Sequence, residues 1–206
     1  MERHPHIFLL QVHQPAVAIF AAEVLSLLPA CARSWAELHF PEWFLPDRIV
    51  LKTCRTGDDI DDEVAAELFD TELKAYNRLR PLQGIVVPRC FGVAWYKDTR
   101  ALVLADVGGH SLATPEAGTL TLEQLSAMLQ ECYRALHAFG VHQDDSLPGN
   151  FVLVGRKLMA VDFEKAVFDQ SADDNAYYMA DCIMDVADKY NRLRRTWRFD
   201  GFLEAA

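Results

Sequence analysis

Glycine is missing from the first part of this 206-residue sequence, although the whole chain contains 10 glycines. The first one is Gly57. Glycine-rich turns are the usual means by which backbone N–H groups close over a bound phosphate. Residues 1–48 therefore cannot form a phosphate-binding loop of the conventional kind.

Metal-binding patterns of cysteine or histidine are absent as well. The five cysteines, at positions 31, 54, 90, 132 and 182, are scattered and odd in number, which is typical of unpaired thiols in a reducing compartment. The seven histidines have no ligand spacing either. We therefore expect no zinc site.

The sequence also has no hydrophobic run of the length that a membrane span needs. The apolar segments 7–10 and 16–28 are separated by polar residues and are too short to cross a bilayer. Residues 30–32, Ala-Cys-Ala, look like a signal-peptide cleavage site, so a secretory signal is the alternative interpretation. We expect a cytoplasmic or nuclear protein with no membrane partner.

Positive charge is scarce, because 20 Lys and Arg face 30 Asp and Glu, for a net charge of −10. A nucleic-acid partner is not expected, since no basic face is available to release counterions. The one basic cluster, at residues 192–198, is interpreted as a solvated helix face. With 51% hydrophobic and 24% charged residues, the chain is typical of a folded globular protein with one core or two small lobes.

Residues 142–166, HQDDSLPGNFVLVGRKLMAVDFEKA, contain the signature of a β-hairpin. Two apolar runs, 151–154 and 158–161, are joined around the turn pair Gly155-Arg156. Short apolar runs separated by a glycine-containing turn predict two antiparallel strands.

This hairpin would bring three oxygen-bearing side chains together. Asp145 and Asn150 precede the first strand, and Asp162 follows the second. Antiparallel pairing places those two ends side by side. Carboxylate and amide oxygens in one place suit Mg²⁺ and phosphate chemistry.

A second polar pair is expected upstream. A short strand at residues 49–52 ends in Lys52, and a helix capped by Asp61 or Asp62 is predicted to run to about residue 80. Glu72 falls within the apolar stripe of that helix, which comprises Ala65, Phe69, Tyr76 and Leu79. A carboxylate on a buried face needs a cation, and Lys52 is the natural partner. The alternative is that Glu72 lies at the edge of the stripe and reaches water.

The remaining elements follow the same rules. Strands are predicted at residues 89–95 and 101–105, and the breaker at residues 106–109 marks a boundary between two halves. A strong helix begins after Thr121, with an apolar side made of Leu122, Leu125, Leu129, Cys132 and Leu136. Gly140 ends it. One or two further helices are predicted over residues 177–198.

The order of these motifs resembles the protein-kinase-like fold, in its branch of small divergent fungal kinase-like proteins, and is similar to aminoglycoside and choline phosphotransferases. No single motif is specific, but the ordered set is. The resemblance covers residues 49–190, and the matching segments are VLK (50–52), ELKAYNRLRPLQG (72–84), VPRCFG (87–92), ALVLADVGG (101–109), LHAFGV (136–141), DSLPGN (145–150) and VDFE (161–164).

The resemblance implies an α+β fold of two lobes. A small β-rich N-lobe with one main helix would occupy residues 49–106, and a short, mostly helical C-lobe with the catalytic loop and the metal-binding turn would occupy residues 107–206. Residues 1–48 would be an atypical extension or replaced N-lobe strands.

It also implies roles for single residues in an ATP- and Mg²⁺-dependent reaction. Lys52 would hold the α- and β-phosphates of ATP and pair with Glu72. Asp145 would be the catalytic base, and Asn150 and Asp162 would bind Mg²⁺. The backbone of the hinge strand would receive the adenine, at Leu104, Ala105, Asp106 and Val107.

Spacing chooses between two neighbouring aspartates for the base. Asp145, not Asp144, lies five residues before Asn150, as in the kinase catalytic loop. In this register Gln143 takes the place of the family's loop histidine, where it can still hydrogen-bond backbone but changes the support of the Asp162 turn. His142 is then expected to be a packing or solvent-facing residue.

The sequence departs from the family at Glu164, where the family usually has glycine, and in the short segment of about forty residues after the Asp-Phe pair, which lacks an Ala-Pro-Glu signature. We expect a phosphotransferase acting on an unidentified hydroxyl-bearing substrate, a small molecule rather than a regulated protein target. The alternative is a weak or inactive pseudokinase that serves as a binding module. The oligomeric state is not predicted.

Overall fold

The computed structural model describes residues 6–13, 25, 29, 32, 35, 36, 39–55 and 60–203. They group into two compact units, the first drawn from Met1–Ala65 and Arg89–Asp106 and the second from Ala66–Pro88 and Val107–Ala206. The helix expected at residues 16–28, all but Leu25, lies outside the described residues. So do the turn at residues 57–59 and residues 30–31 of the cleavage-like segment.

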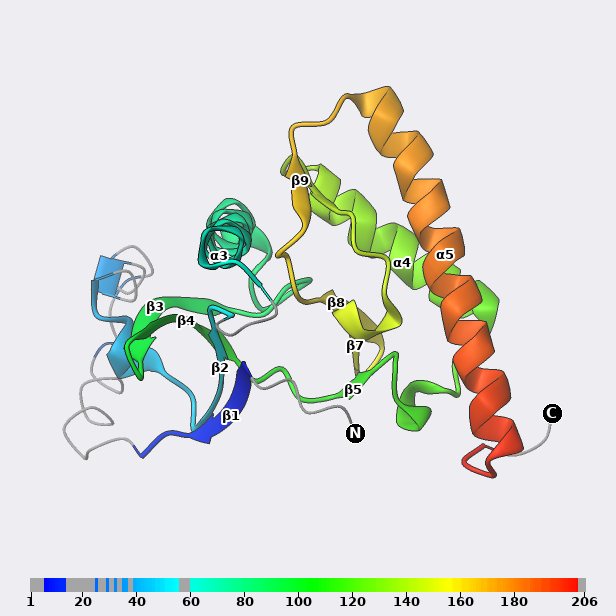
Figure 1. Ribbon diagram of the computed structural model, residues 1–206, viewed down its shortest axis with the longest axis horizontal. Helices are drawn as coiled ribbons and strands as arrows, with labels where there is room; N and C mark the ends of the chain where they lie inside the picture. Colours follow the sequence, from blue (N-terminus) through cyan, green and yellow to red (C-terminus); the bar gives the residue numbers. More distant parts are fainter. Residues whose placement is uncertain are drawn as a thin grey trace. The chain divides into compact units, whose positions relative to one another are not determined.

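The first unit is built on a curved antiparallel sheet with the strand order β1-β2-β4-β3 (Figure 1). Its strands are β1 (Ile7–Gln11), β2 (Arg48–Thr53), β3 (Cys90–Tyr96) and β4 (Thr99–Ala105), and a short 3₁₀ turn, η1 (Pro41–Phe44), precedes β2. The expected strands at residues 49–52, 89–95 and 101–105 are confirmed. The strand β1 was not predicted.

The β3–β4 hairpin turns on Lys97 and Asp98, the polar pair between the two predicted strands. Both residues have positive φ, +49° and +63°, although neither is glycine. Positive φ at both central positions is the requirement of a type I′ turn, whose twist matches that of the flanking strands. Pairing of Tyr96 with Thr99 closes this two-residue loop.

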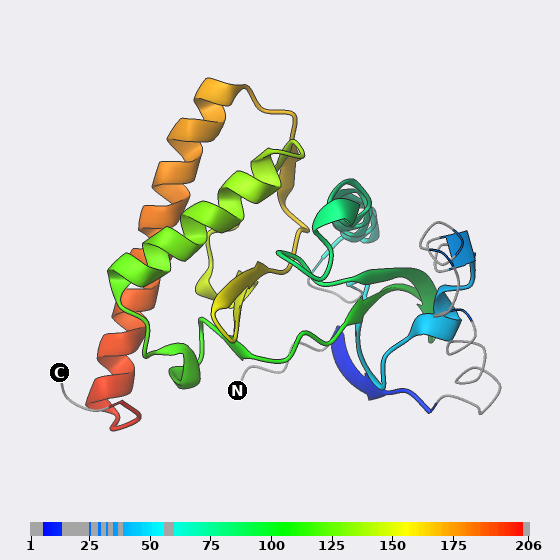
Figure 2. The same ribbon diagram turned by 180° about the vertical axis from the view of Figure 1, so that it is seen from behind.

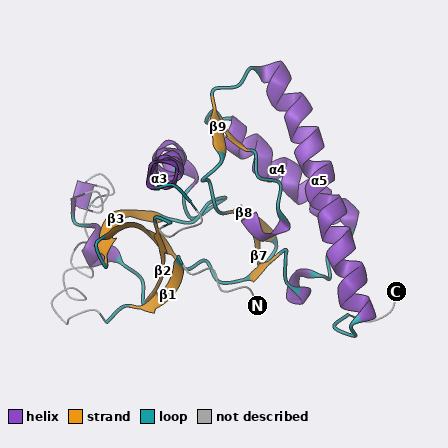
Figure 3. Cartoon of the chain, viewed as in Figure 1, coloured by secondary structure: helices purple, strands orange, loops and turns teal. Residues whose placement is uncertain are grey.

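The described part of the second unit contains three α-helices, a sheet of three strands and a sheet of two strands. Figure 3 colours the helices purple and the strands orange. Helix α3 (Asp62–Arg78) begins at the end of the first unit and continues here, and η2 (Arg80–Leu82) follows it. Asp61 caps the helix, since its Oδ1 accepts a hydrogen bond of 2.8 Å from the Glu63 N–H. The predicted apolar stripe is confirmed, because Ala65, Phe69, Tyr76 and Leu79 are all buried.

Helices α4 (Leu122–His137) and α5 (Ala172–Phe199) lie side by side in both views (Figures 1 and 2). Thr121 and Gln124 form a capping box at the start of α4, as expected from its threonine cap. The predicted apolar side is confirmed for Leu125, Leu129, Cys132 and Leu136, which are buried, but is wrong for Leu122, the first residue of the helix, which is 37% exposed. Residues 177–198 form part of one helix. None of the described helices is long and apolar enough to cross a membrane.

The predicted hairpin is confirmed as β7 (Phe151–Val154) and β8 (Lys157–Ala160), to which β5 (His110–Ser111) adds a third strand. Gly155 has φ +60°, the sign that the tight two-residue turn needs at its first position. The chain enters this hairpin from β6 (Val141–Gln143) through η4 (Pro148–Asn150), and η3 (Pro115–Ala117) precedes α4. After the hairpin, β9 (Ala166–Phe168) pairs antiparallel with β6.

Candidate functional site

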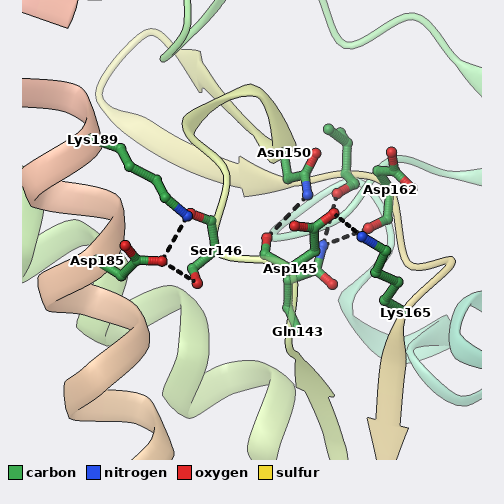
Figure 4. Close-up of polar contacts among 9 residues, drawn as sticks. Gln143, Asp145, Ser146, Asn150, Asp162, Lys165, Asp185 and Lys189 are labelled. Atoms are coloured by element: carbon green, nitrogen blue, oxygen red, sulfur yellow. Dashed lines mark hydrogen bonds and ion pairs between the residues drawn. The ribbon is translucent and has the colours of Figure 1, made fainter. Parts of the chain in front are cut away.

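The loop between β6 and β7 holds the candidate catalytic base. The Asn150 side-chain amide donates a hydrogen bond of 3.0 Å to the Asp145 backbone oxygen (Figure 4). The same carbonyl accepts from the Leu147 N–H at 2.8 Å, and the Asn150 N–H donates to the Leu147 carbonyl at 3.0 Å. The five-residue spacing thus closes a compact loop. Asn150 is 7% exposed, and its amide nitrogen donates to the loop, so the amide oxygen is the side-chain atom that could bind a metal.

Gln143 connects this loop to the Asp162 turn. Its Nε2 donates to the Val161 carbonyl at 3.0 Å and to the Asp162 carbonyl at 2.5 Å (Figure 4). Gln143 is fully buried, so these two carbonyls fix its orientation. The expectation that a glutamine here hydrogen-bonds backbone is confirmed, and the carbonyls that it binds belong to the Asp162 turn.

Asp162 has an unusual backbone, with φ +64° directly after β8. Left-handed conformations of non-glycine residues are uncommon and concentrate at functional sites. Here Val161 still belongs to the ladder, because its N–H donates to the Asn150 carbonyl at 2.8 Å. The reversal at Asp162 therefore ends the strand and turns the carboxylate-bearing residue out of the hairpin.

Three carboxylates gather at this turn. One oxygen each from Glu72, Asp162 and Glu164 lies within 4.8 Å of the others. The Phe163 N–H donates to Glu72 Oε1 at 3.3 Å, and the ring of Tyr76 packs edge-on against the ring of Phe163 at 5.5 Å. Helix α3 is therefore fixed directly to the turn that carries Asp162.

Burial decides between the two interpretations of Glu72. The residue is 1% exposed, so the alternative that it reaches water is wrong. Glu164, which stands where the family usually has glycine, is 8% exposed and joins the same cluster. A second buried carboxylate at this turn raises the need for cationic or metal compensation.

Two lysines at the catalytic loop were not singled out by the sequence. Lys165 Nζ lies 3.5 Å from Asp145 Oδ2. On the other side of the loop, Lys189 on α5 donates to the Ser146 carbonyl at 3.1 Å and to Asp185 Oδ2 at 2.7 Å (Figure 4). Asp185 also accepts a hydrogen bond of 2.9 Å from the Ser146 hydroxyl. The pKa of Asp185 is lowered, chiefly by its bond to Lys189.

The sequence signals for these lysines were weak but present. Lys165 directly follows the Asp-Phe-Glu run, and Asp185 and Lys189 have the i, i+4 spacing of a helical ion pair. Neither pattern says which part of the chain it will meet, so only the fold places them beside the loop.

His142 is a packing residue, as expected. It is 1% exposed, shares a hydrogen bond of 2.7 Å with His137, and lies 3.8 Å from the Cys182 sulfur and 3.9 Å from the Asp144 carboxylate. Burial lowers the pKa of His142 and lowers that of His137 to about 4, so both rings are neutral at pH 7. Burial also raises the pKa of the Cys182 thiol, which is free and unreactive in this setting.

The remaining site candidates lie mainly in the first unit. Lys52 is 5% exposed on β2, and its register partners Ile7 and Leu102 place all three side chains on one face of the sheet. The pairing of Lys52 with Glu72 stays a prediction, since the two residues lie in different units.

The hinge segment is ordered within its own sheet. Leu104 pairs with Val50 across β2 and β4, and the Ala105 N–H donates to the Arg89 carbonyl at 2.8 Å. Asp106 Oδ2 lies 2.8 Å from Arg48 Nη2. Adenine contacts with the backbone of residues 104–107 stay a prediction.

The donor set of the second unit fits a hard divalent cation. Asp162, the Asn150 amide oxygen and the neighbouring glutamates are all oxygen ligands, which Mg²⁺ prefers over nitrogen or sulfur. Among the described residues, no cysteine or histidine joins this cluster. Such a donor set could hold a metal ion and its phosphate ligands near the Asp145 carboxylate, an arrangement that is compatible with phosphoryl transfer.

Comparison with known proteins supports the fold. No protein-family model and no curated protein matches the sequence, whereas many solved structures match the fold. One of them is a divergent kinase of Toxoplasma that lacks the glycine-rich loop and regulates membrane ultrastructure of the parasitophorous vacuole; it is 13% identical, with a TM-score of 0.53 over 90% of this chain. This chain spans 65% of the length of that structure. The fold is therefore kinase-like, a mixed α/β arrangement of antiparallel sheets and helices.

Proposed function

We propose that this protein is a Mg²⁺-dependent phosphotransferase with a two-lobed kinase-like fold, which transfers the γ-phosphoryl group of ATP to a hydroxyl. The observation that carries the proposal is the joined loop and turn of the second unit. Asn150 binds the backbone of Asp145, and Gln143 binds the backbone of Asp162. Two of these four polar residues thus fix the backbone of the other two, and one of those, Asp162, has a left-handed backbone of the kind that concentrates at functional sites.

In this proposal Asp145 accepts the proton of the acceptor hydroxyl. The hydroxyl oxygen forms a bond to the γ-phosphorus, the bond from that phosphorus to the bridging oxygen breaks, and ADP leaves. Asn150 and Asp162 would hold Mg²⁺, which supplies neutralisation of the phosphate charge. Lys52 would hold the α- and β-phosphates, and the backbone of residues 104–107 would receive the adenine.

The missing glycine-rich loop does not by itself favour the pseudokinase alternative. The Toxoplasma protein is described as a kinase although it lacks that loop. Loss of the loop removes backbone contacts to phosphate, but phosphoryl transfer depends mainly on positioning and on charge neutralisation. In the pseudokinase alternative the same residues are kept, but the absence of the glycine-rich loop prevents productive ATP binding.

Thermal denaturation with Mg·ATP tests the proposal. A ligand that binds only the native state raises the apparent melting temperature, by an amount that grows with ligand concentration above Kd. We expect a rise with Mg·ATP at millimolar concentration. No rise under these conditions would contradict the phosphotransferase.

Two variants test the roles. Asp162→Asn should abolish the Mg²⁺-dependent part of the rise. Asp145→Asn should keep the rise and lose transfer of the γ-phosphoryl group, and equal loss of binding in both variants would show that the roles are assigned wrongly. Asp181→Asn, on the exposed surface of α5, is the matched control and should behave as the wild type.

A further inference from the structure

The region around the candidate base is strongly acidic. Asp144 and Asp145 lie on the loop, and Asp162 and Glu164 lie on the turn, with buried Glu72 joining them from α3. Mg·ATP would bring further negative charge to this place. Cations that reach the transferred group are therefore decisive for phosphoryl transfer here.

Most cationic side chains around this loop and turn are not placed to reach the transferred phosphoryl group. Arg156 and Lys157 lie at the turn of the β7–β8 hairpin, whose register pairs Val154 with Lys157. The base lies at the other end, where Phe151 faces Ala160, about 10 Å away along the strands. Lys189 lies across the loop, bonded to Asp185 and the Ser146 carbonyl (Figure 4).

Lys165 is different. Its Nζ lies 3.5 Å from Asp145 Oδ2, and its side chain is 62% exposed, while that of Asp145 is 23% exposed. The ion pair is thus open to an incoming substrate. Lys165 approaches one carboxylate oxygen and leaves the other for a hydroxyl proton (Figure 4).

We infer that Lys165 is a further catalytic residue, whose ammonium group contacts the γ-phosphoryl group during transfer. This rests on the proposed function. A hydroxyl hydrogen-bonded to the base at about 2.6–3.2 Å has its oxygen about 3–3.5 Å from the phosphorus it attacks. An ammonium beside the base on a flexible four-carbon stem therefore reaches the equatorial oxygens of that phosphorus.

The role of Lys165 is electrostatic. As the new oxygen–phosphorus bond forms and the bridging bond breaks, the hydroxyl proton moves to Asp145 and ADP departs. Negative charge spread over the three equatorial oxygens is stabilised by the ammonium, which itself keeps all its protons. Before substrate binds, the same ammonium holds the Asp145 carboxylate in one orientation.

Comparing Mg·ATP with Mg·ADP tests this inference, because only ATP has the γ-phosphoryl group. Affinities of the purified full chain would be obtained from ligand-dependent melting temperatures. Lys165→Met removes the charge and keeps the stem, and should weaken Mg·ATP by about tenfold or more while changing Mg·ADP by less than about twofold. Lys165→Arg should restore part of the ATP preference, which a purely structural role would not predict.

Lys157→Met is the matched control, since Lys157 is an exposed lysine at the far end of the β7–β8 hairpin, and it should leave both affinities unchanged. If Lys165→Met weakens both nucleotides equally, or neither, the inference is wrong and the proposed function stands. If it strengthens Mg·ATP, Lys165 occupies the phosphate position and inhibits binding, which also overturns the inference. If the wild type binds neither nucleotide, the proposed function fails and this inference fails with it.

Discussion

Gln143 offers the sharpest test of how the site is held together. Its side chain is fully buried, and its Nε2 donates to the carbonyls of Val161 and Asp162. Gln143→Leu keeps the bulk and removes both donors. Gln143→Glu keeps the shape but offers only acceptors, so its carboxylate would face two carbonyl oxygens.

The structure sets the size of the effect. Each hydrogen bond lost contributes about 1 kcal/mol net, so the leucine variant should lower the free energy of unfolding by about 2 kcal/mol. Gln143 Oε1 is buried without a hydrogen-bond partner, and removing it offsets a small part of this loss. For a chain of this length, 2 kcal/mol corresponds to a melting temperature about 4–8 °C lower. The glutamate variant should lose more at pH 7.

The measurement is thermal denaturation combined with hydrogen exchange of peptides covering residues 158–166. Exchange at the Val161 amide, which donates to Asn150, reports directly on opening of the turn. Gln130→Leu, a partly exposed glutamine of α4, is the matched control. If both Gln143 variants melt within about 1 °C of the wild type with unchanged exchange, Gln143 does not support the turn, and the reasoning fails.

Three further predictions concern the frame around the site. Arg78 and Asp169 form a two-pronged ion pair, so Arg78→Asp and Asp169→Arg should each lower the melting temperature and the double variant should recover part of the loss. Because Arg78 lowers the pKa of Asp169, this contribution is present at neutral pH and should disappear as the pH falls below 3.8. Burial lowers the pKa values of His142 and His137, so the unfolded chain binds more protons than the folded chain, and the free energy of unfolding should fall from pH 6.5 towards about 4. His142→Phe should reduce this pH dependence of the melting temperature. Tyr190→Phe removes donation to the Ala117 carbonyl at 2.7 Å and should cost about 1 kcal/mol in urea denaturation.

Most of the correct predictions rested on local patterns in the sequence. The hairpin followed from two apolar runs and a glycine turn, the start of α4 at Thr121 followed from its helix-capping residue type, and the stripe of α3 followed from helical spacing. These features depend on residues within a few positions of one another. The order of the polar motifs likewise followed from spacing along the chain, whereas the solved structure, at 13% identity, supports only the kinase-like fold.

Contacts between distant segments could not be predicted. Glu72 binds the Phe163 N–H from 91 positions away, and Arg78 binds Asp169 across the same separation. Periodicity placed Glu72 within the stripe of its helix but left burial and exposure equally open. Only the path of the chain from α3 to the turn decides that this carboxylate is buried and which backbone group it accepts from.

Because no glycine precedes Gly57, the contacts between distant segments become important for the proposed site. In the proposed phosphotransferase, residues 1–48 supply no glycine-rich backbone cradle for phosphate, so the order of a bound triphosphate would come from its metal and from side chains. In that proposal the metal position would depend on Asp162, whose left-handed backbone is flanked by the hydrogen bond from Gln143 and by the Glu72–Phe163 bond. A fixed position of Asp162 would then compensate for the missing glycine-rich loop, because a fixed metal ligand needs no reorganisation when charge develops. On this reasoning, changes to the supports of Asp162 should affect Mg²⁺-dependent nucleotide binding more than they affect the stability of the chain.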